Sequence, residues 1–351
     1  MLRNEWNCGQ RLFRRTVVRY VAALGALALA ALGRAEPAGP TIRSQEPWAD
    51  WFGGQEAALH FVVTAPAAFQ GRLEWSFSTS GRTLARREQA VAIEAAHAQI
   101  VEIRLPIPEV KPGVVVDAAL TLALVGTEAA GAHATLQRPI RIFPKDPFVD
   151  RAVWLKKLDI ALFDPEGRTA TLFEKAGIPF RVLRDQDAIE NLKTGLLVVG
   201  EGVSFRAQRG LGARLPRLAA RGVPVLCLAP AEGAFPMPGV AAEDQPMPSS
   251  VRLDGPRMIA RLNKRLDAET WPPDGRIARA GFTLQAERAG IVASVTEGAM
   301  VWSWIEARYP HHPRGRLIVC AFEIVTRWEA GPAPRYCLAE LLDYATKPGD
   351  E

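Results

Sequence analysis

Four carboxylates follow short apolar runs of this 351-residue sequence. Asp164 follows LDIALF, Glu201 follows GLLVVG, Glu232 lies in PAEG after VPVLCLA, and Glu323 ends the phrase CAFE. Uniformly apolar runs are typical of strands buried on both faces, and a parallel sheet places ligands at the carboxyl ends of its strands. Two carboxyl groups about 5 to 9 Å apart can support glycoside hydrolysis. We therefore take these four as candidate ligand-facing positions, although acidic residues in such turns also cap helices.

Aromatic and sulfur-bearing residues offer fewer sites. Trp48 and Trp51 in PWADWFGG are a candidate aromatic platform for sugar stacking, or plug the end of a sandwich core. The cysteines that follow the leader lie in apolar contexts without a CxxC motif, so we expect buried free thiols, with a Cys320 to Cys337 disulfide as the alternative. Neither they nor the scattered histidines have ligand spacing, and no metal or cofactor is predicted.

The region from 158 to 346 alternates apolar runs with amphipathic segments, which predicts a doubly wound α/β domain. Strands are expected at 158–163, 179–183, 196–199 and 223–228, with helices at 169–176 and 187–192. Gly210, Gly212 and Pro216 should break the helix that starts near Ser204. Further along the chain we expect a loop at 230–248, a helix at 258–266, a hairpin at 282–287 and 291–296, strands at 300–305 and 316–324, and a helix at 333–345.

Residues 57 to 147 alternate apolar and polar side chains with a period of two. The pattern recurs at 59–63, 73–77, 101–105, 120–124 and 140–142, with turn residues between. About seven such strands predict an all-β, immunoglobulin-like sandwich. The expected plan is a leader at 1–35, a linker at 36–56, this sandwich, a connector at 148–157, the α/β domain at 158–346 and a tail at 347–351.

The α/β region resembles the class I glutamine amidotransferase-like fold, including its nucleophile-lacking versions such as the β-galactosidase trimerisation domain. The resemblance rests on DPEG, LLVVGEG, RGVPVLCLAPAEG and GRLIVCAFE. It implies that GEG at 200–202 matches the oxyanion-hole loop and that VPVLCLAPA leads to the nucleophile position. The sandwich is similar to domains that accompany bacterial glycoside hydrolases, through RLEWSFSTSGRTLARREQAV and IPEVKPGVVVDAALTLAL.

The sequence departs from the active family where its chemistry occurs. Ala229, Pro230 and Ala231 occupy the strand-to-helix turn that would expose a nucleophile, and Cys227 lies earlier, inside the apolar strand. The last strand carries an apolar residue at the family's histidine position and retains only Glu323. Without a base beside a thiolate no nucleophile is activated, so no catalytic residue is assigned and a non-catalytic protein is favoured.

The first 35 residues have the pattern of a secretory signal peptide. Arginines precede the apolar run 21–33, and small residues end near Ala35. Cleavage predicts a periplasmic or secreted protein rather than an integral membrane protein, with an uncleaved anchor as the alternative. Residues 36 to 351 carry 37 basic and 37 acidic residues, so their formal charge is zero and nucleic-acid binding has no electrostatic basis.

These observations predict an exported, non-catalytic binding or assembly protein of the bacterial cell envelope, related to carbohydrate. Its expected partner is a glycan or an envelope protein. The alternative is a carboxylate-based glycoside hydrolase, or a hydrolase accessory protein, acting at the strand ends of the α/β domain. A third hypothesis is a sugar-binding module that uses tryptophans, including Trp302 and Trp304 of VWSW.

Overall fold

A computed structural model describes residues 39–127, 132–236, 245–266, 271, 282–285, 292–295, 303–310, 312 and 314–348. The expected leader at 1–35 lies outside these residues. None of the helices described is both long enough and apolar enough to cross a bilayer.

The N-terminal part is a β-sandwich. One sheet has the order β1-β3-β6, and the other has the order β2-β8-β7-β4-β5. Their inner faces share one apolar core, which includes Leu59, Leu73, Val101 and Leu120. The strands are β1 (Thr41–Ser44), β2 (Asp50–Phe52), β3 (Glu56–Thr64), β4 (Phe69–Thr79), β5 (Arg82–Ile93), β6 (Ala98–Pro106), β7 (Val116–Gly126) and β8 (Ala132–Phe143). The strands predicted from alternation are confirmed, because alternate side chains of β3, β4, β6 and β7 are buried.

Three strands of the sandwich were not predicted. β1 and β2 lie in the segment expected to be a linker, where β1 pairs with β3 and β2 pairs in parallel with β8. β5 pairs with β4 along its whole length, but only Val91 and Ile93, near the end of the strand, are buried. Because most β5 side chains are exposed and lie outside the core, the strand has no apolar alternation to detect.

The C-terminal part contains a seven-stranded sheet in the order β10-β9-β11-β12-β18-β17-β14. The first five strands are parallel, while β17 and β14 run antiparallel to their neighbours. The strands are β9 (Ile160–Phe163), β10 (Phe180–Val182), β11 (Leu196–Val199), β12 (Val225–Leu228), β14 (Ser250–Asp254), β17 (Trp304–Arg308) and β18 (Arg316–Cys320). The helices are α2 (Ala152–Lys157), α3 (Arg168–Lys175), α4 (Gln186–Glu190), α5 (Leu211–Ala220), α6 (Met258–Leu262) and α7 (Pro332–Thr346).

Helices cover both faces of this sheet. Leu172 of α3 and Leu338 of α7 pack with Ile160 and Ile318 in one core. Ile189 of α4 and the apolar residues of α5 pack with the alternate strand positions in a second core. β9, β11 and β12 are apolar throughout because each is buried from two sides, as the uninterrupted runs predicted.

The expected break in the helix after Ser204 is wrong for Gly212 and Pro216, which both lie inside α5. A proline removes one backbone donor, but Pro216 is in the second turn and its ring is buried with the apolar face of α5. At Gly212 an added Cβ would lie 2.7 Å from Cδ of Pro236, so the absence of a side chain permits close packing.

The predicted loop at 230–248 also contains a short strand, β13 (Ala234–Pro236), while its residues 237–244 lie outside the described parts. β13 pairs with β15 (Phe282–Gln285), which pairs antiparallel with β16 (Val292–Val295). The predicted hairpin is thereby confirmed. The strand expected at 300–305 begins instead at Trp304 among the described residues.

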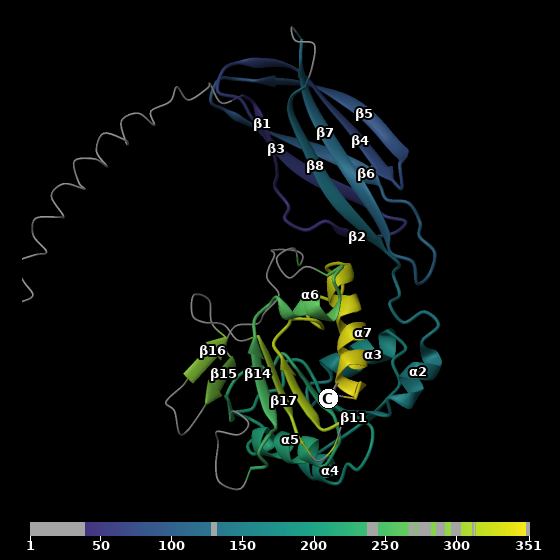
Figure 1. Ribbon diagram of the computed structural model, residues 1–351, viewed down its shortest axis with the longest axis vertical. Helices are drawn as coiled ribbons and strands as arrows, with labels where there is room; N and C mark the ends of the chain where they lie inside the picture. The colour runs from purple at the N-terminus through teal and green to yellow at the C-terminus, as the bar shows by residue number, and fades with distance from the viewer. Residues whose placement is uncertain are drawn as a thin grey trace, which may run out of the picture.

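The sandwich and the α/β region meet at the beginning of α7, which reaches toward β2 in Figure 1. The Tyr336 hydroxyl donates to the carbonyl of Pro144 (3.1 Å), and its ring lies 4.8 Å from that of Phe143. The Arg335 guanidinium lies 4.6 Å from the ring centroid of Phe52 and donates to the carbonyl of Lys145 (3.1 Å). One apolar core includes Phe52 and Phe143 together with residues of α7, so the two parts share buried surface.

Candidate functional site

Glu201 connects the loop after β11 to the turn after β18 and to helix α3, at the carboxyl ends of the parallel strands. Its side chain follows β11, is 2% exposed, and accepts hydrogen bonds from the turn after β18. Oε2 accepts from the Val325 amide (2.7 Å), and Oε1 accepts from the Thr326 amide (2.9 Å) and hydroxyl (2.5 Å). The Glu201 amide donates to Oγ1 of Thr169 in α3 (2.9 Å). The carboxylate predicted to face a ligand therefore binds the protein's own backbone.

Asp164 is held at the beginning of α3. Its Oδ2 accepts a hydrogen bond from the Ala170 amide (2.9 Å), which satisfies a donor of the first helical turn. The residue is 8% exposed, and within the described chain its Oδ1 is buried without a hydrogen-bond donor. A Cβ at Gly200 would lie 2.7 Å from Oδ1, so the glycine lets the β11 loop approach the carboxylate. This places Asp164 beside the residue that precedes Glu201.

The other two predicted carboxylates interact with cations of neighbouring turns. Glu232 lies 3.4 Å from Nη1 of Arg206 and accepts from the Ser204 hydroxyl (3.1 Å). Glu323 accepts from Nε of Arg327 (2.8 Å), four residues further along the chain. Strand order brings the loops of all four carboxylates to one edge of the sheet, but each carboxylate interacts with groups of the protein itself.

Cys227 is inside the sheet rather than at its edge. It is fully buried in β12 on the face covered by α5, and burial raises the pKa of its thiol well above the usual value. Ala229 lies two residues further along the chain. Its amide donates to the carbonyl of Cys320 (2.6 Å), and its carbonyl accepts from the Gly202 amide (3.0 Å). Cys320 and Cys337 are also buried free thiols, and burial raises the pKa of each. The prediction of free, buried cysteines is confirmed.

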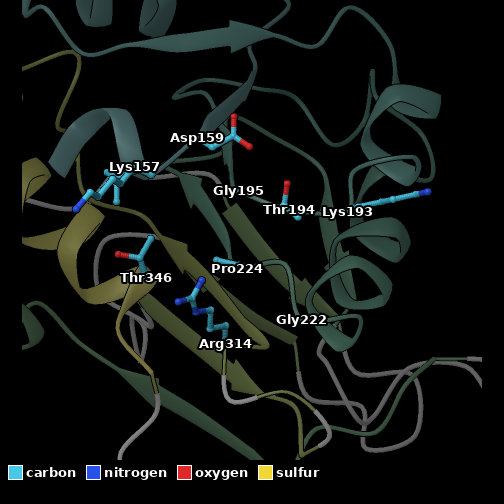
Figure 2. A pocket seen from close by; sticks show the side chains of 10 residues that line it. Lys157, Asp159, Lys193, Thr194, Gly195, Gly222, Pro224, Arg314 and Thr346 are labelled. Atoms are coloured by element: carbon cyan, nitrogen blue, oxygen red, sulfur yellow. The ribbon is translucent and has the colours of Figure 1, made fainter. Parts of the chain in front are cut away.

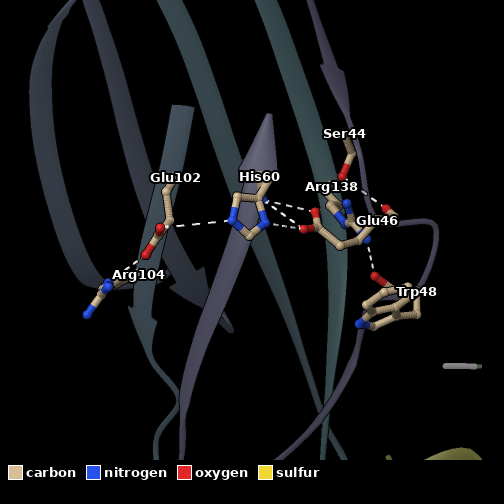
Figure 3. Close-up of polar contacts among 7 residues, drawn as sticks. All are labelled: Ser44, Glu46, Trp48, His60, Glu102, Arg104 and Arg138. Atoms are coloured by element: carbon tan, nitrogen blue, oxygen red, sulfur yellow. Dashed lines mark hydrogen bonds and ion pairs between the residues drawn. The ribbon is translucent and has the colours of Figure 1, made fainter. Parts of the chain in front are cut away.

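The two tryptophans of the candidate platform differ in their surroundings. Trp51 lies in β2 and packs partly against the sandwich core, with its Nε1 buried and lacking a described acceptor. Trp48 is partly buried, and its carbonyl accepts a hydrogen bond from Arg138. Figure 3 shows this bond beside the contact of Glu46 with His60, whose Nδ1 lies 2.5 Å from Oε1. The segment between β1 and β2 thus contacts β3 through Glu46 and β8 through the Trp48 carbonyl.

The second tryptophan motif contributes to the core. Trp304 is fully buried, with its ring centroid 6.3 Å from that of Phe322 and 5.8 Å from that of Tyr344. Trp302 lies outside the described residues. In the described ranges no three His, Cys, Asp or Glu side chains are grouped so that they could hold a metal ion.

One cavity lies at the opposite edge, beside the amino ends of β9, β11 and β12. Its volume is about 520 Å³, and Lys157, Asp159, Lys193 and Arg314 are among the residues that line it. In Figure 2 the two lysines extend to opposite sides and do not point toward a common centre. The cavity therefore lacks the convergent groups that a charged ligand would need.

A polar cluster on β17 was not predicted. Glu306 is 2% exposed; its Oε1 accepts from Nε of Arg308 (2.8 Å), and its Oε2 accepts from the hydroxyl of Tyr344 (2.8 Å). Nε of Arg316 lies 3.4 Å from Oε1. Burial and the bond to Glu306 raise the pKa of the Tyr344 phenol, so it remains a donor. The alternation of charged and apolar residues in WIEAR was the available signal, since it marks a strand with one polar face.

No protein-family model and no curated protein matches the sequence. Solved structures match in part. The sporulation control protein Spo0M from Bacillus subtilis aligns with 34% of this chain and 55% of its own, at 13% identity and a TM-score of 0.24. The CARDB domain of a Pyrococcus furiosus protein, in complex with di-metal ions, aligns with 30% of this chain and 92% of its own, at 9% identity and a TM-score of 0.21.

A β-glucosidase from Listeria innocua, in complex with gluconolactone, aligns with 29% of this chain and 16% of its own, at 7% identity and a TM-score of 0.22. This chain therefore spans about half of Spo0M and a small part of the glucosidase. Alignments at these TM-scores do not define a shared fold, and the chemistry of the site rests on the contacts described above.

Proposed function

We propose that this chain is an exported, non-catalytic binding or assembly protein of the bacterial cell envelope, and that its partner is carbohydrate-related. The observation that carries the proposal is the engagement of Glu201. At the edge where a parallel sheet would bind substrate, this carboxylate accepts three hydrogen bonds from Val325 and Thr326 and holds two loops together. A carboxylate used in this way maintains the shape of a surface rather than transferring a proton.

The proposal includes a fold assignment for the α/β region as a flavodoxin-like, amidotransferase-like domain without a nucleophile. Numbered by their order along the chain, its parallel strands follow 2-1-3-4-5, which is the flavodoxin-like order. The buried Cys227 and the hydrogen-bonded backbone of Ala229 support the loss of the nucleophile. We assign the sandwich as an immunoglobulin-like domain and place the domain boundary at residues 148–157, which contain α2.

Export is proposed from the leader at 1–35 alone, with cleavage near Ala35. The neutral formal charge of residues 36 to 351 suits a protein that does not bind nucleic acid. Recovering the full chain from the periplasm of a host and sequencing its N-terminus tests this part. A chain that retains its leader and sediments with membranes would contradict it.

A carboxylate-based hydrolase is a second candidate because one carboxyl oxygen at the strand ends has no donor among the residues that the structure describes. Oδ1 of Asp164 is buried beside Gly200, and Glu323, whose side chain is 20% exposed, is a second carboxylate of this edge. Two carboxyl groups at one edge are the kind of pair that glycoside hydrolysis uses.

The experiment is retention and turnover measured on the same sample. The full chain, recovered after export, is incubated with an array of neutral and acidic oligosaccharides, and envelope proteins are captured in parallel. We expect at least one oligosaccharide to be retained and released intact. Cleavage of a retained oligosaccharide that is lost in both Asp164→Asn and Glu323→Gln, but kept in Glu232→Gln, would establish the hydrolase instead.

A further inference from the structure

The edge of the seven-stranded sheet carries three cross-strand rows of side chains on one face. In the first row Ser250 lies opposite Arg308, which lies opposite Arg316. In the second, Arg252 lies opposite Glu306. Directly opposed residues point to the same side of a sheet, with Cβ atoms about 4.5 to 5.5 Å apart. Three guanidinium groups are therefore gathered around one carboxylate.

The third row closes the cluster on one side. Asp254 lies opposite the buried Trp304, and its Oδ2 is paired with Nη1 of Arg261 at 3.0 Å. That pair is neutral as a unit. The side chains of Arg252 and Arg308 in the first two rows both contact the carboxylate of Glu306. Two guanidinium groups that reach the surface therefore share this carboxylate.

A hollow opens over Arg252, Glu306 and Arg308. Its volume is about 660 Å³, and its lining includes Ser250, Arg252, Glu306 and Arg308. The side chain of Arg316 is 5% exposed and donates to the carbonyl of Tyr344, so it belongs to the floor. The side chains of Arg252 and Arg308 are 49% and 30% exposed. These two are the cations available to a ligand.

Glu306 holds the guanidinium of Arg308 in place rather than neutralising the site. Arg308 uses Nε for Glu306 (2.8 Å), while its Nη2 is 3.5 Å from the Tyr344 hydroxyl. Arg252 is only loosely paired, with Nη1 3.9 Å from Oε2 of Glu306. A guanidinium has five N–H donors, so both arginines retain donors that can reach an oxyanion. Glu306 is a positioning residue because it acts through Arg308.

We propose that this hollow binds the carboxylate of an acidic sugar residue, with Arg252 and Arg308 as donors and the Ser250 hydroxyl available to a ring oxygen. Charge complementarity selects an oxyanion, and the planar guanidinium forks match a carboxylate with two oxygens. The assignment to a sugar rests on the proposed function, whereas the assignment to an oxyanion rests on the arginines.

Calorimetric titration of the full chain tests the proposal with three probes: a trigalacturonate, a neutral trisaccharide of the same length, and inorganic sulfate. We expect the trigalacturonate to bind more tightly than either of the others. Arg252→Gln and Arg308→Gln should each weaken its binding about ten- to a hundredfold, the range expected for lost charge-assisted bonds. Arg87→Gln, which alters an exposed arginine of β5, is the matched control and should leave binding unchanged.

Folding is checked by near-ultraviolet circular dichroism, and Arg252→Lys separates charge from geometry. The lysine variant should recover part of the affinity, since it keeps the charge and loses the fork. Equal binding of trigalacturonate by both glutamine variants and the control would overturn the site. Sulfate binding as tight as trigalacturonate binding would overturn the sugar assignment.

These outcomes are separable from those of the proposed function. A neutral oligosaccharide retained equally by the wild-type chain and both arginine variants would contradict this site and leave the binding function standing. Arginine-dependent trigalacturonate binding followed by cleavage would support the site and contradict the non-catalytic function.

Discussion

Replacing Glu201 with glutamine tests whether this residue is structural. The glutamine side chain has the same shape, but its amide nitrogen must face at least one of the donors of Val325 and Thr326 that the carboxylate accepts. A hydrogen bond to a charged group contributes about 1.5 to 3 kcal/mol, and a buried donor without an acceptor costs about 1 to 3 kcal/mol. We expect Glu201→Gln to reduce the free energy of unfolding by about 2 to 4 kcal/mol.

Glu323→Gln is the matched control, because it alters a carboxylate two residues before the same turn. Glu323 is partly exposed and pairs with Arg327, four residues further along the chain, so the loss of its charge should reduce the free energy of unfolding by less than about 1 kcal/mol. Urea unfolding measures both variants. Hydrogen exchange at the Val325 and Thr326 amides reports on the turn even where the sandwich and the α/β region unfold separately. Equal stability losses in the two variants, with unchanged exchange at these amides, would refute the reasoning.

Three further predictions concern thiols, acid and the junction between the two parts. Because burial raises the pKa of Cys227 and the other two core thiols, iodoacetamide at pH 8 should label none in the native protein and all three in urea; native labelling at position 227 contradicts the packing. Hydrogen bonding to Lys175 lowers the pKa of Glu329 in the folded chain. The ionised Glu329 therefore stabilises the fold above its unfolded pKa, about 4.3, and this stabilisation is lost as pH falls through the lower folded pKa. Glu329→Gln should therefore reduce the loss of stability below about pH 4.5 by less than about 1 kcal/mol, since the carboxylate is mostly exposed. An unchanged dependence of the free energy of unfolding on pH counts against the Lys175–Glu329 pair. Arg335→Ala removes the contact with Phe52 and should reduce the free energy of interaction between the sandwich and the α/β region by about 2 to 3 kcal/mol. Urea should then give two separated unfolding transitions instead of overlapping ones.

The strands could be predicted where burial leaves a periodic trace. Runs such as LDIALF are buried from two sides, and the alternation around Leu59 and Leu73 matches strands buried on one side. β5 leaves no such trace, because its side chains are mostly exposed and backbone pairing with β4 defines it. Pro216 shows the reverse case, since tertiary packing of α5 outweighs the local cost of a proline.

The candidate site was predicted by position but not by role. Strand order places the loops of Asp164 and Glu201 at one edge, as parallel topology requires. That Glu201 accepts its hydrogen bonds from Val325 and Thr326 depends on a contact across more than 120 residues, which no local pattern encodes. Glu306 was missed for the same reason, because its partner Tyr344 lies on a helix 38 residues away.

The most direct test of a binding protein without catalysis is the fate of a bound oligosaccharide. The exported chain is held with its retained oligosaccharide through a long incubation, and the mass of the released sugar is measured. The account predicts release at the original mass. Shortened products that disappear with Asp164→Asn would contradict it.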